Sequence, residues 1–139
     1  MSKKSLSCVL LADRHHGLAE GVRGLLDAVF ETVVMVADET SLLEGANRLQ
    51  PEVAVVDLSL ARDRSLEWLR MLRAQSPDLR IVVISIHDEE SVRQAVIEAG
   101  ADAFVLKRAI VNDLLPAVDL IRTDRSNGAS AIGERTEES

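Results

Sequence analysis

Five short apolar runs, separated by segments with a helical period, strongly restrict what this chain can fold into. The runs are rich in Val and Ile and are mostly continuous; they cover residues 6–12, 32–37, 53–56, 81–86 and 103–106. Continuous apolar strands are typical of parallel sheets that are buried on both faces. Each run is followed by a segment in which apolar residues recur every three or four positions, as in Leu18, Val22, Leu25 and Val29. The alternation predicts an α/β fold with five parallel strands, five helices and right-handed crossovers.

Helix boundaries are marked independently of this periodicity. Pro51 and Pro77 each separate a predicted helix from the next strand, because the residue before a proline avoids helical geometry. Gly100 stands where a helix would end in a left-handed residue. Ser41 with Glu44 could form a capping box, and Pro116 is expected in the first turn of the last helix.

The length of 139 residues predicts a single domain. Beyond Arg122 the sequence becomes small and polar, with a Glu-rich end. We therefore expect an N-terminal extension over residues 1–5, the folded domain over 6–122 and a disordered polar tail over 123–139.

Composition narrows the partners and the cellular setting. Sixteen Lys and Arg against 23 Asp and Glu give a net charge of −7, which repels the phosphates of nucleic acids. No apolar run approaches the roughly 18 residues of a membrane span, and the first residues lack a signal-peptide core. The single cysteine, Cys8, excludes an internal disulfide and is expected in the core. We expect a cytoplasmic protein that binds neither DNA nor membrane directly.

Polar residues follow four of the predicted strands directly. They are Asp13, Asp57, Ser85 and Lys107. In an open α/β sheet, ligands bind beyond the carboxyl ends of the strands, where the strand order reverses. Asp57 is the most informative of the four, because a carboxylate next to buried strand residues is costly unless it meets a cation, donors or a metal. Each residue alone could be structural, but four strand ends together predict a site.

These segments resemble the receiver domain of bacterial two-component response regulators, from residue 6 to about residue 122. Residues 10–13 resemble the acidic end of the family's first strand, and residues 51–57 resemble the strand that delivers its phospho-accepting aspartate. Residues 81–85 resemble the strand that ends in the switch hydroxyl, and residues 100–107 are similar to the family's Gly-Ala-Asp segment. The implied fold is flavodoxin-like, doubly wound, with strand order 2-1-3-4-5.

The resemblance also implies roles for individual residues. These are Asp57 as phospho-acceptor, Asp13 as a member of the acidic pocket, Ser85 as switch hydroxyl, Phe104 as switch aromatic and Lys107 as phosphoryl partner. A carboxylate oxygen can take a phosphoryl group, whose charge then needs neutralising by a cation and hydrogen-bond donors. If Mg²⁺ binds, its ligands would be Asp13, Asp57 and the backbone of Ser59.

Arg14 departs from the family, which normally has there a second acidic residue that binds Mg²⁺ directly. A guanidinium removes an oxygen ligand and repels the ion, so Mg²⁺ binding is doubtful. We hypothesise that Arg14 lies over Asp57 as a built-in counter-ion; the alternative is that it points into solvent. Ile86 also replaces a small residue and could narrow access for a phosphodonor, and residues 60–65 lack the usual Pro and Gly.

Two adjacent histidines, His15 and His16, lie after Arg14. Adjacent positions on a helix do not share a face, and no third ligand is apparent, so we expect no metal site there. The Arg-rich run over residues 62–73 is expected to be a solvated helix face.

Three functions remain open. The first is a receiver that accepts a phosphoryl group on Asp57 from a histidine kinase or phosphotransfer protein. It would signal to a protein partner, or a homodimer, through the face of the fourth helix, fifth strand and fifth helix. The second is a pseudo-receiver, a protein-binding module that works without phosphorylation. The third, an enzyme on the same scaffold, is disfavoured, because Ser59 stands where an aspartyl phosphatase has a second acid and no Gly-rich loop follows the first strand.

Overall fold

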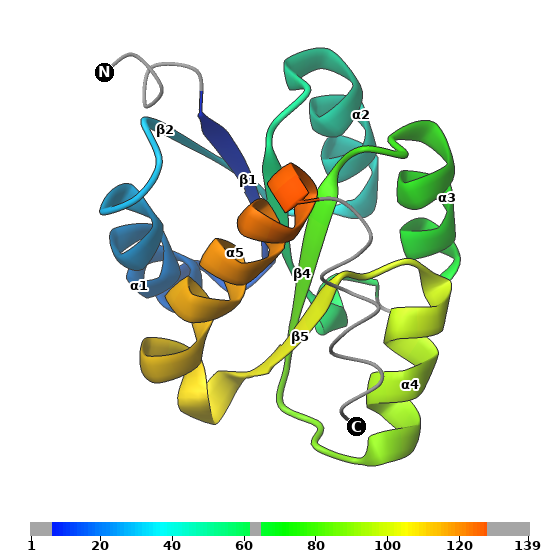
Figure 1. Cartoon of the computed structure of the whole chain (residues 1–139). Coiled ribbons are helices and arrows are strands. Elements are labelled where there is room, and N and C mark those ends of the chain that lie inside the picture. Colours follow the sequence, from blue (N-terminus) through cyan, green and yellow to red (C-terminus); the bar gives the residue numbers. More distant parts are fainter. Residues whose placement is uncertain (1–6, 62–64, 128–139) are drawn as a thin grey trace.

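All five apolar runs form strands in the computed structural model, which describes residues 7–61 and 65–127 (Figure 1). The strands are β1 (Cys8–Ala12), β2 (Thr32–Val36), β3 (Val53–Asp57), β4 (Arg80–Ser85) and β5 (Ala103–Leu106). They form one parallel sheet in the order β2-β1-β3-β4-β5. The predicted fold class and strand order are therefore confirmed.

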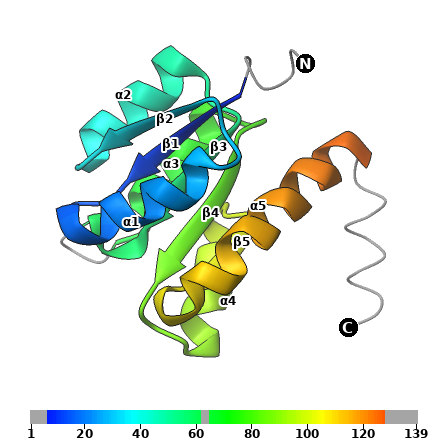
Figure 2. The same ribbon diagram turned by 90° about the vertical axis from the view of Figure 1, so that its left-hand side faces the viewer.

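Five helices cover the two faces of the sheet. They are α1 (His16–Asp27), α2 (Glu39–Leu49), α3 (Glu67–Gln75), α4 (Glu90–Ala99) and α5 (Ile110–Asn127). Helices α1 and α5 pack on one face and α2, α3 and α4 on the other (Figure 2). Two short 3₁₀ helices follow strands at the carboxyl edge, η2 (Leu58–Leu60) after β3 and η3 (Lys107–Ala109) after β5.

The continuous apolar pattern of the strands reflects these two covered faces. Along β1, Val9 and Leu11 pack toward α1 and α5, while Leu10 and Ala12 pack toward α2 and α3. The same alternation divides β3, and every residue of that strand is buried. Because both sides of each central strand need an apolar side chain, no polar residue lies in the interior of β1, β3 or β4.

Several element ends differ from the sequence predictions. The carboxylate of Asp38, not a box of Ser41 and Glu44, caps α2 by accepting the N–H of Ser41 at 2.7 Å. Helix α5 begins at Ile110, so Pro116 lies inside the helix rather than in its first turn. Cys8 is only partly buried, and burial raises the pKa of its thiol.

The carboxyl-terminal boundary also differs. Helix α5 runs to Asn127, five residues beyond the predicted end of the domain, so the predicted disordered tail does not begin at residue 123. The rest of that tail, the predicted extension over residues 1–5 and the loop residues 62–64 lie outside the described residues. Within the described part of the chain, no helix is long and apolar enough to cross a membrane.

Arg73 joins three elements instead of facing solvent as the Arg-rich run predicted. Its guanidinium makes six hydrogen bonds, to the carbonyls of Ser76, Pro77 and Leu79, twice to the carbonyl of Gly100, and to the Asp102 carboxylate. Asp102 in turn accepts the N–H of Ile81 at the start of β4. These contacts hold the end of α3, the start of β4 and the turn before β5 together.

Candidate functional site

Three strands end in the same local turn at the carboxyl edge of the sheet. Asp13 and Asp57 each accept, through Oδ1, the backbone N–H of the residue two positions later, at 2.8 Å. The Ser85 hydroxyl accepts the N–H of His87 in the same way, also at 2.8 Å. Asp and Ser side chains favour such turns because they satisfy backbone donors just after a strand. The turns aim three polar side chains at one edge of the sheet.

The strand register brings these ends together. Ala12 pairs with Val56 across β1 and β3, so Asp13 and Asp57 follow on adjacent strands. This pair of strands is where the order reverses, since β1 is followed in sequence by β2 on one side and β3 lies on the other. Ligands of open α/β sheets bind at such a reversal.

Asp57 is almost completely buried, with 1% of its surface exposed. Oδ1 accepts two hydrogen bonds from Ser59, one from the backbone and one from the hydroxyl, both at 2.8 Å. Oδ2 lies 2.5 Å from the Lys107 ammonium and, among the described residues, has no hydrogen bond besides this ion pair. The carboxylate is therefore held by Ser59 on one oxygen and by a cation on the other.

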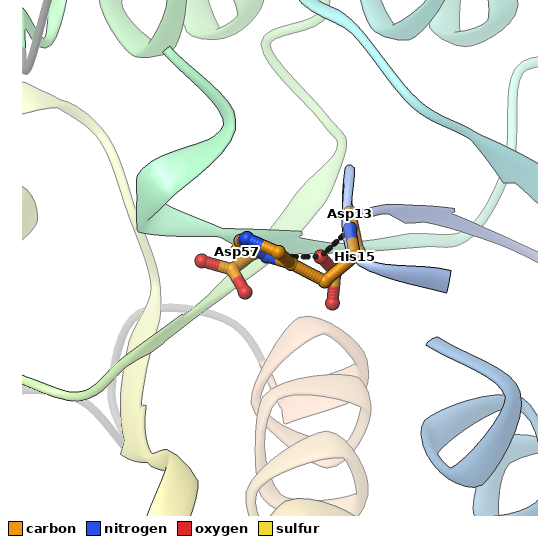
Figure 3. A group of neighbouring side chains, drawn as sticks. All are labelled: Asp13, His15 and Asp57. Atoms are coloured by element: carbon orange, nitrogen blue, oxygen red, sulfur yellow. Dashed lines mark hydrogen bonds and ion pairs between the residues drawn. The ribbon is translucent and has the colours of Figure 1, made fainter. Parts of the chain in front are cut away.

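Asp13 lies beside this pair and contacts His15. The N–H of His15 donates to Asp13 Oδ1, and the imidazole Nδ1 lies 3.4 Å from the same oxygen. Burial raises the pKa of the Asp13 carboxyl, and the negative charge of Asp57 adds to this, against the hydrogen bond from His15. Figure 3 shows Asp13, His15 and Asp57 converging, and one potential ligand atom from each lies within 4.8 Å of the others.

Arg14 is exposed, and in the described part of the chain no hydrogen bond or ion pair joins it to Asp13 or Asp57. The cation in contact with Asp57 is Lys107, whose side chain is 18% exposed. The predicted counter-ion role of Arg14 thus has no contact to support it in this structure, and it stays a prediction.

The other residues considered in the sequence lie on or directly after the neighbouring strands β4 and β5. Ser85 is buried at the end of β4, and Leu106, its partner on β5, precedes Lys107. Phe104 is partly buried against the core beneath α4. Ile86 is 68% exposed just after Ser85, which leaves its predicted effect on access untested. Arg108 pairs with Asp88 at 3.1 Å on the same edge.

Sequence reasoning missed the side chains of Ser59 and His15. Both stand two residues after a strand-end aspartate, which is the spacing at which an Asp accepts a backbone N–H. That spacing could have indicated that each lies beside its aspartate. The expectation that His15 belongs to a helix face was wrong, because α1 begins at His16 and His15 has extended backbone angles.

The sequence matches the response regulator receiver domain family over residues 9–119. It is 33% identical over 115 residues to a nitrate/nitrite response regulator protein homolog of Haemophilus influenzae, covering 81% of this chain and 55% of that protein. It is 34% identical over 112 residues to the nitrate/nitrite response regulator protein NarP of Escherichia coli, covering 79% and 52%. The chain therefore belongs to the receiver domain family of response regulators, and it spans about half the length of these curated relatives.

Solved structures agree with this assignment. A LuxR-family two-component response regulator from Aurantimonas superimposes with a TM-score of 0.76 at 26% identity, covering 83% of this chain and 84% of that one. A response regulator from Burkholderia pseudomallei, solved with a phosphorylated aspartic acid, a calcium ion and citrate, gives 0.72 at 25% identity and covers 96% and 75%.

Receiver domains typically bind Mg²⁺ at an acidic pocket, and the residues here fit that ion poorly. Mg²⁺ demands near-octahedral oxygen coordination. The pocket offers two carboxylates, and one of them already accepts two hydrogen bonds and an ion pair. Arg14 occupies the position of the third, and a further potential donor close to the carboxylates is the imidazole nitrogen of His15.

Proposed function

We propose that this chain accepts a phosphoryl group on Asp57 from a histidine kinase or phosphotransfer protein in the cytoplasm. The observation that carries the proposal is the ion pair between Asp57 and Lys107 at the point where the strand order reverses. A buried carboxylate is kept ionised most readily when a cation and hydrogen-bond donors surround it. An ionised carboxylate is also the form that can act as a nucleophile.

The chain's own residues supply the groups that the transfer needs. A carboxylate oxygen of Asp57 forms a bond to phosphorus while the bond between phosphorus and the donor's histidine nitrogen breaks, and the electron pair stays on that nitrogen. The Lys107 ammonium, now on Oδ2, would neutralise charge on the transferred group. Ser85 Oγ accepts the N–H of His87, and its own O–H, which donates to no described residue, can donate to a phosphoryl oxygen.

The B. pseudomallei relative supports the proposal, since its structure contains a phosphorylated aspartic acid. We further propose that a protein partner binds the face formed by α4, β5 and α5. Phe104 lies on β5, and Lys107 directly follows this strand. Because Lys107 pairs with Asp57, a change at Asp57 can reach this face through Lys107 and β5. Val111 and Leu120 of α5 and Ile97 of α4 are exposed apolar side chains on these elements.

Intact-mass analysis after incubation with a small-molecule phosphodonor tests the acceptor role. We expect an adduct of one phosphoryl group on the wild-type chain and none on Asp57→Asn. Ser85→Ala is expected to form the same adduct more slowly, because the substitution removes a hydrogen-bond donor but not the nucleophile. Parallel incubations with Mg²⁺ and with a chelator measure whether the reaction needs that ion.

The pseudo-receiver is the second candidate, and the contacts of Asp57 favour it. Ser59 donates twice to one oxygen and Lys107 pairs with the other, so each carboxylate oxygen has a partner without phosphate or metal. If neither small donors nor a phosphorylated histidine phosphotransfer protein produce an Asp57-dependent adduct, the acceptor proposal is wrong and this second function is favoured.

A further inference from the structure

The hydroxyl of Ser59 lies beside a carboxylate that is held in place by other contacts. Ser59 Oγ donates to Asp57 Oδ1 at 2.8 Å, and the backbone N–H of Ser59 donates to the same oxygen at the same distance. The other oxygen of Asp57 pairs with the Lys107 ammonium. A hydroxyl within hydrogen-bond reach of a base, with that base oriented by a third group, is the arrangement that activates serine nucleophiles.

Ser59 is also the more accessible member of this pair. The residue is partly exposed, whereas Asp57 has 1% of its surface exposed. A donor that enters from solvent therefore finds the serine at a more open position than the carboxylate. A hydroxyl oxygen keeps its lone pairs when its hydrogen is donated, so Oγ can attack while its proton moves to Oδ1.

We propose that Ser59 is a second phosphoryl acceptor of this pocket, with Asp57 as its general base. Ser59 Oγ forms a bond to phosphorus while the bond between phosphorus and the leaving atom of the donor breaks, and the electron pair stays on that leaving atom. The Ser59 proton passes to Asp57 Oδ1, as the proton of a substrate hydroxyl passes to the catalytic-loop Asp of protein kinases. The product is a phosphate ester of serine.

Lys107 supplies the positive charge that this step needs. Its ammonium contacts the same carboxylate that accepts the Ser59 hydroxyl, so it can neutralise charge on the transferred group. The chain contains a second Ser–Asp pair for comparison. Ser41 is hydrogen-bonded to Asp38 through its backbone and its side chain, and among the described residues Asp38 has no ion pair with a cation. We therefore expect no phosphorylation of Ser41.

The two acceptors of the pocket exclude one another. A phosphoserine carries a charge of about −1.5 to −2 at neutral pH, and at position 59 it would stand beside the Asp57 carboxylate. Conversely, an Asp57 that carries a phosphoryl group no longer offers a carboxylate base to Ser59. One chain therefore takes one phosphoryl group, either as an acyl phosphate or as a stable ester. This inference shares its phosphoryl donor with the proposed function but does not need Asp57 to be the acceptor.

Hydroxylamine separates the two acceptors, because it cleaves an acyl phosphate and leaves a serine ester intact. The whole chain is incubated with acetyl phosphate and Mg²⁺, treated with neutral hydroxylamine and measured by intact-mass analysis. We expect a resistant adduct of one phosphoryl group, which fragmentation places on Ser59. Ser59→Ala should lose this adduct, and Asp57→Asn should form it at least about a hundredfold more slowly, because the general base is removed. The matched control, Ser41→Ala, should form it as the wild type does.

One further variant separates a chemical role of the hydroxyl from a structural one. Ser59→Thr keeps a hydroxyl and is expected to retain a resistant adduct at position 59, with circular dichroism showing that all variants are folded. A wild-type chain with only a hydroxylamine-labile adduct, or with none, would overturn the proposal, and so would a resistant adduct that forms at an unchanged rate in Asp57→Asn. The labile adduct reports separately on Asp57: its absence beside a resistant adduct would contradict the proposed function and leave the role of Ser59 supported.

Discussion

Replacing Arg73 by Lys removes a planar donor group from the junction of α3, β4 and the turn before β5. The guanidinium makes six hydrogen bonds, five of them to backbone carbonyls. An ammonium donates at most three, so at least three contacts are lost even if the lysine reaches the same place. The Arg73 side chain is 25% exposed, and water can therefore compensate part of the loss.

The expected destabilisation follows from these contacts. A hydrogen bond contributes about 0.5–1.5 kcal/mol net, and two of the six share the Gly100 carbonyl, so we expect a loss of about 2 kcal/mol. For a domain of this size, this corresponds to a decrease in Tm of roughly 8 °C. The change is large against the total stability of about 5–15 kcal/mol that is typical of such domains.

Thermal unfolding followed by circular dichroism measures the effect, with Arg70→Lys as the matched control. Arg70 lies one turn earlier on the same helix and is mostly exposed, and its one ion pair among the described residues is with Glu67 at 3.7 Å. Its replacement is expected to change Tm by less than about 2 °C. A Tm of Arg73→Lys within that same range would refute the reasoning, because it would show that the six contacts contribute no net stability.

Three other substitutions test separate features. Gly100→Ala should lower the free energy of unfolding by about 1–3 kcal/mol in urea denaturation, since φ is +132° and the new Cβ would lie 2.9 Å from Arg73 Cβ; an unchanged midpoint would contradict this. Asp13→Asn, studied with a chelator, should raise Tm at neutral pH, because burial raises the pKa of that carboxyl and the folded state loses stability as pH rises through the raised value. The advantage should shrink as pH falls toward 3.8, and a destabilised Asn variant at pH 7 would be inconsistent with it. Asp38→Ala should lower Tm at neutral pH by removing the cap of α2. The pKa of Asp38 is lowered by its hydrogen bonds to Ser41, so the Tm difference between wild type and variant should disappear as pH falls through that lowered value. A Tm difference that stays constant with pH would argue against capping.

The strands could be predicted closely from the sequence because burial on both faces demands an uninterrupted apolar run. Their carboxyl ends could be predicted for the same reason, since the first polar residue after each run marks the edge of the sheet. Asp57 is the last residue of β3 and Lys107 directly follows β5, and the structure joins them in an ion pair. The apolar pattern of the sequence therefore predicts where each strand lies and which polar side chain stands at its carboxyl end.

Contacts made by long side chains across loops could not be predicted in this way. Arg73 and Arg70 both belong to the Arg-rich run. Of the two, Arg73 donates to backbone carbonyls of Leu79 and Gly100, which lie in the segments before β4 and β5. His15 and Arg14 are likewise adjacent, and the turn at Asp13 directs the histidine toward the pocket while the arginine is exposed. Whether a side chain points toward the pocket or into solvent depends on the backbone angles of two or three loop residues, and an apolar pattern does not predict these angles.

Helix α5 begins at the pocket edge of the sheet and ends at the opposite one. Its last residue with a described side chain, Arg122, pairs with Glu52 at 3.0 Å and lies 4.9 Å from the centre of the Phe30 ring. The helix has 18 residues, a length of about 27 Å at 1.5 Å per residue. A rotation of about 5° at η3 would displace the far end by roughly 2 Å. The buried side chain of Ile121 packs in the core at that end, beside the partly exposed charge and cation–π contacts, so such a rotation would repack the core as well as these surface contacts.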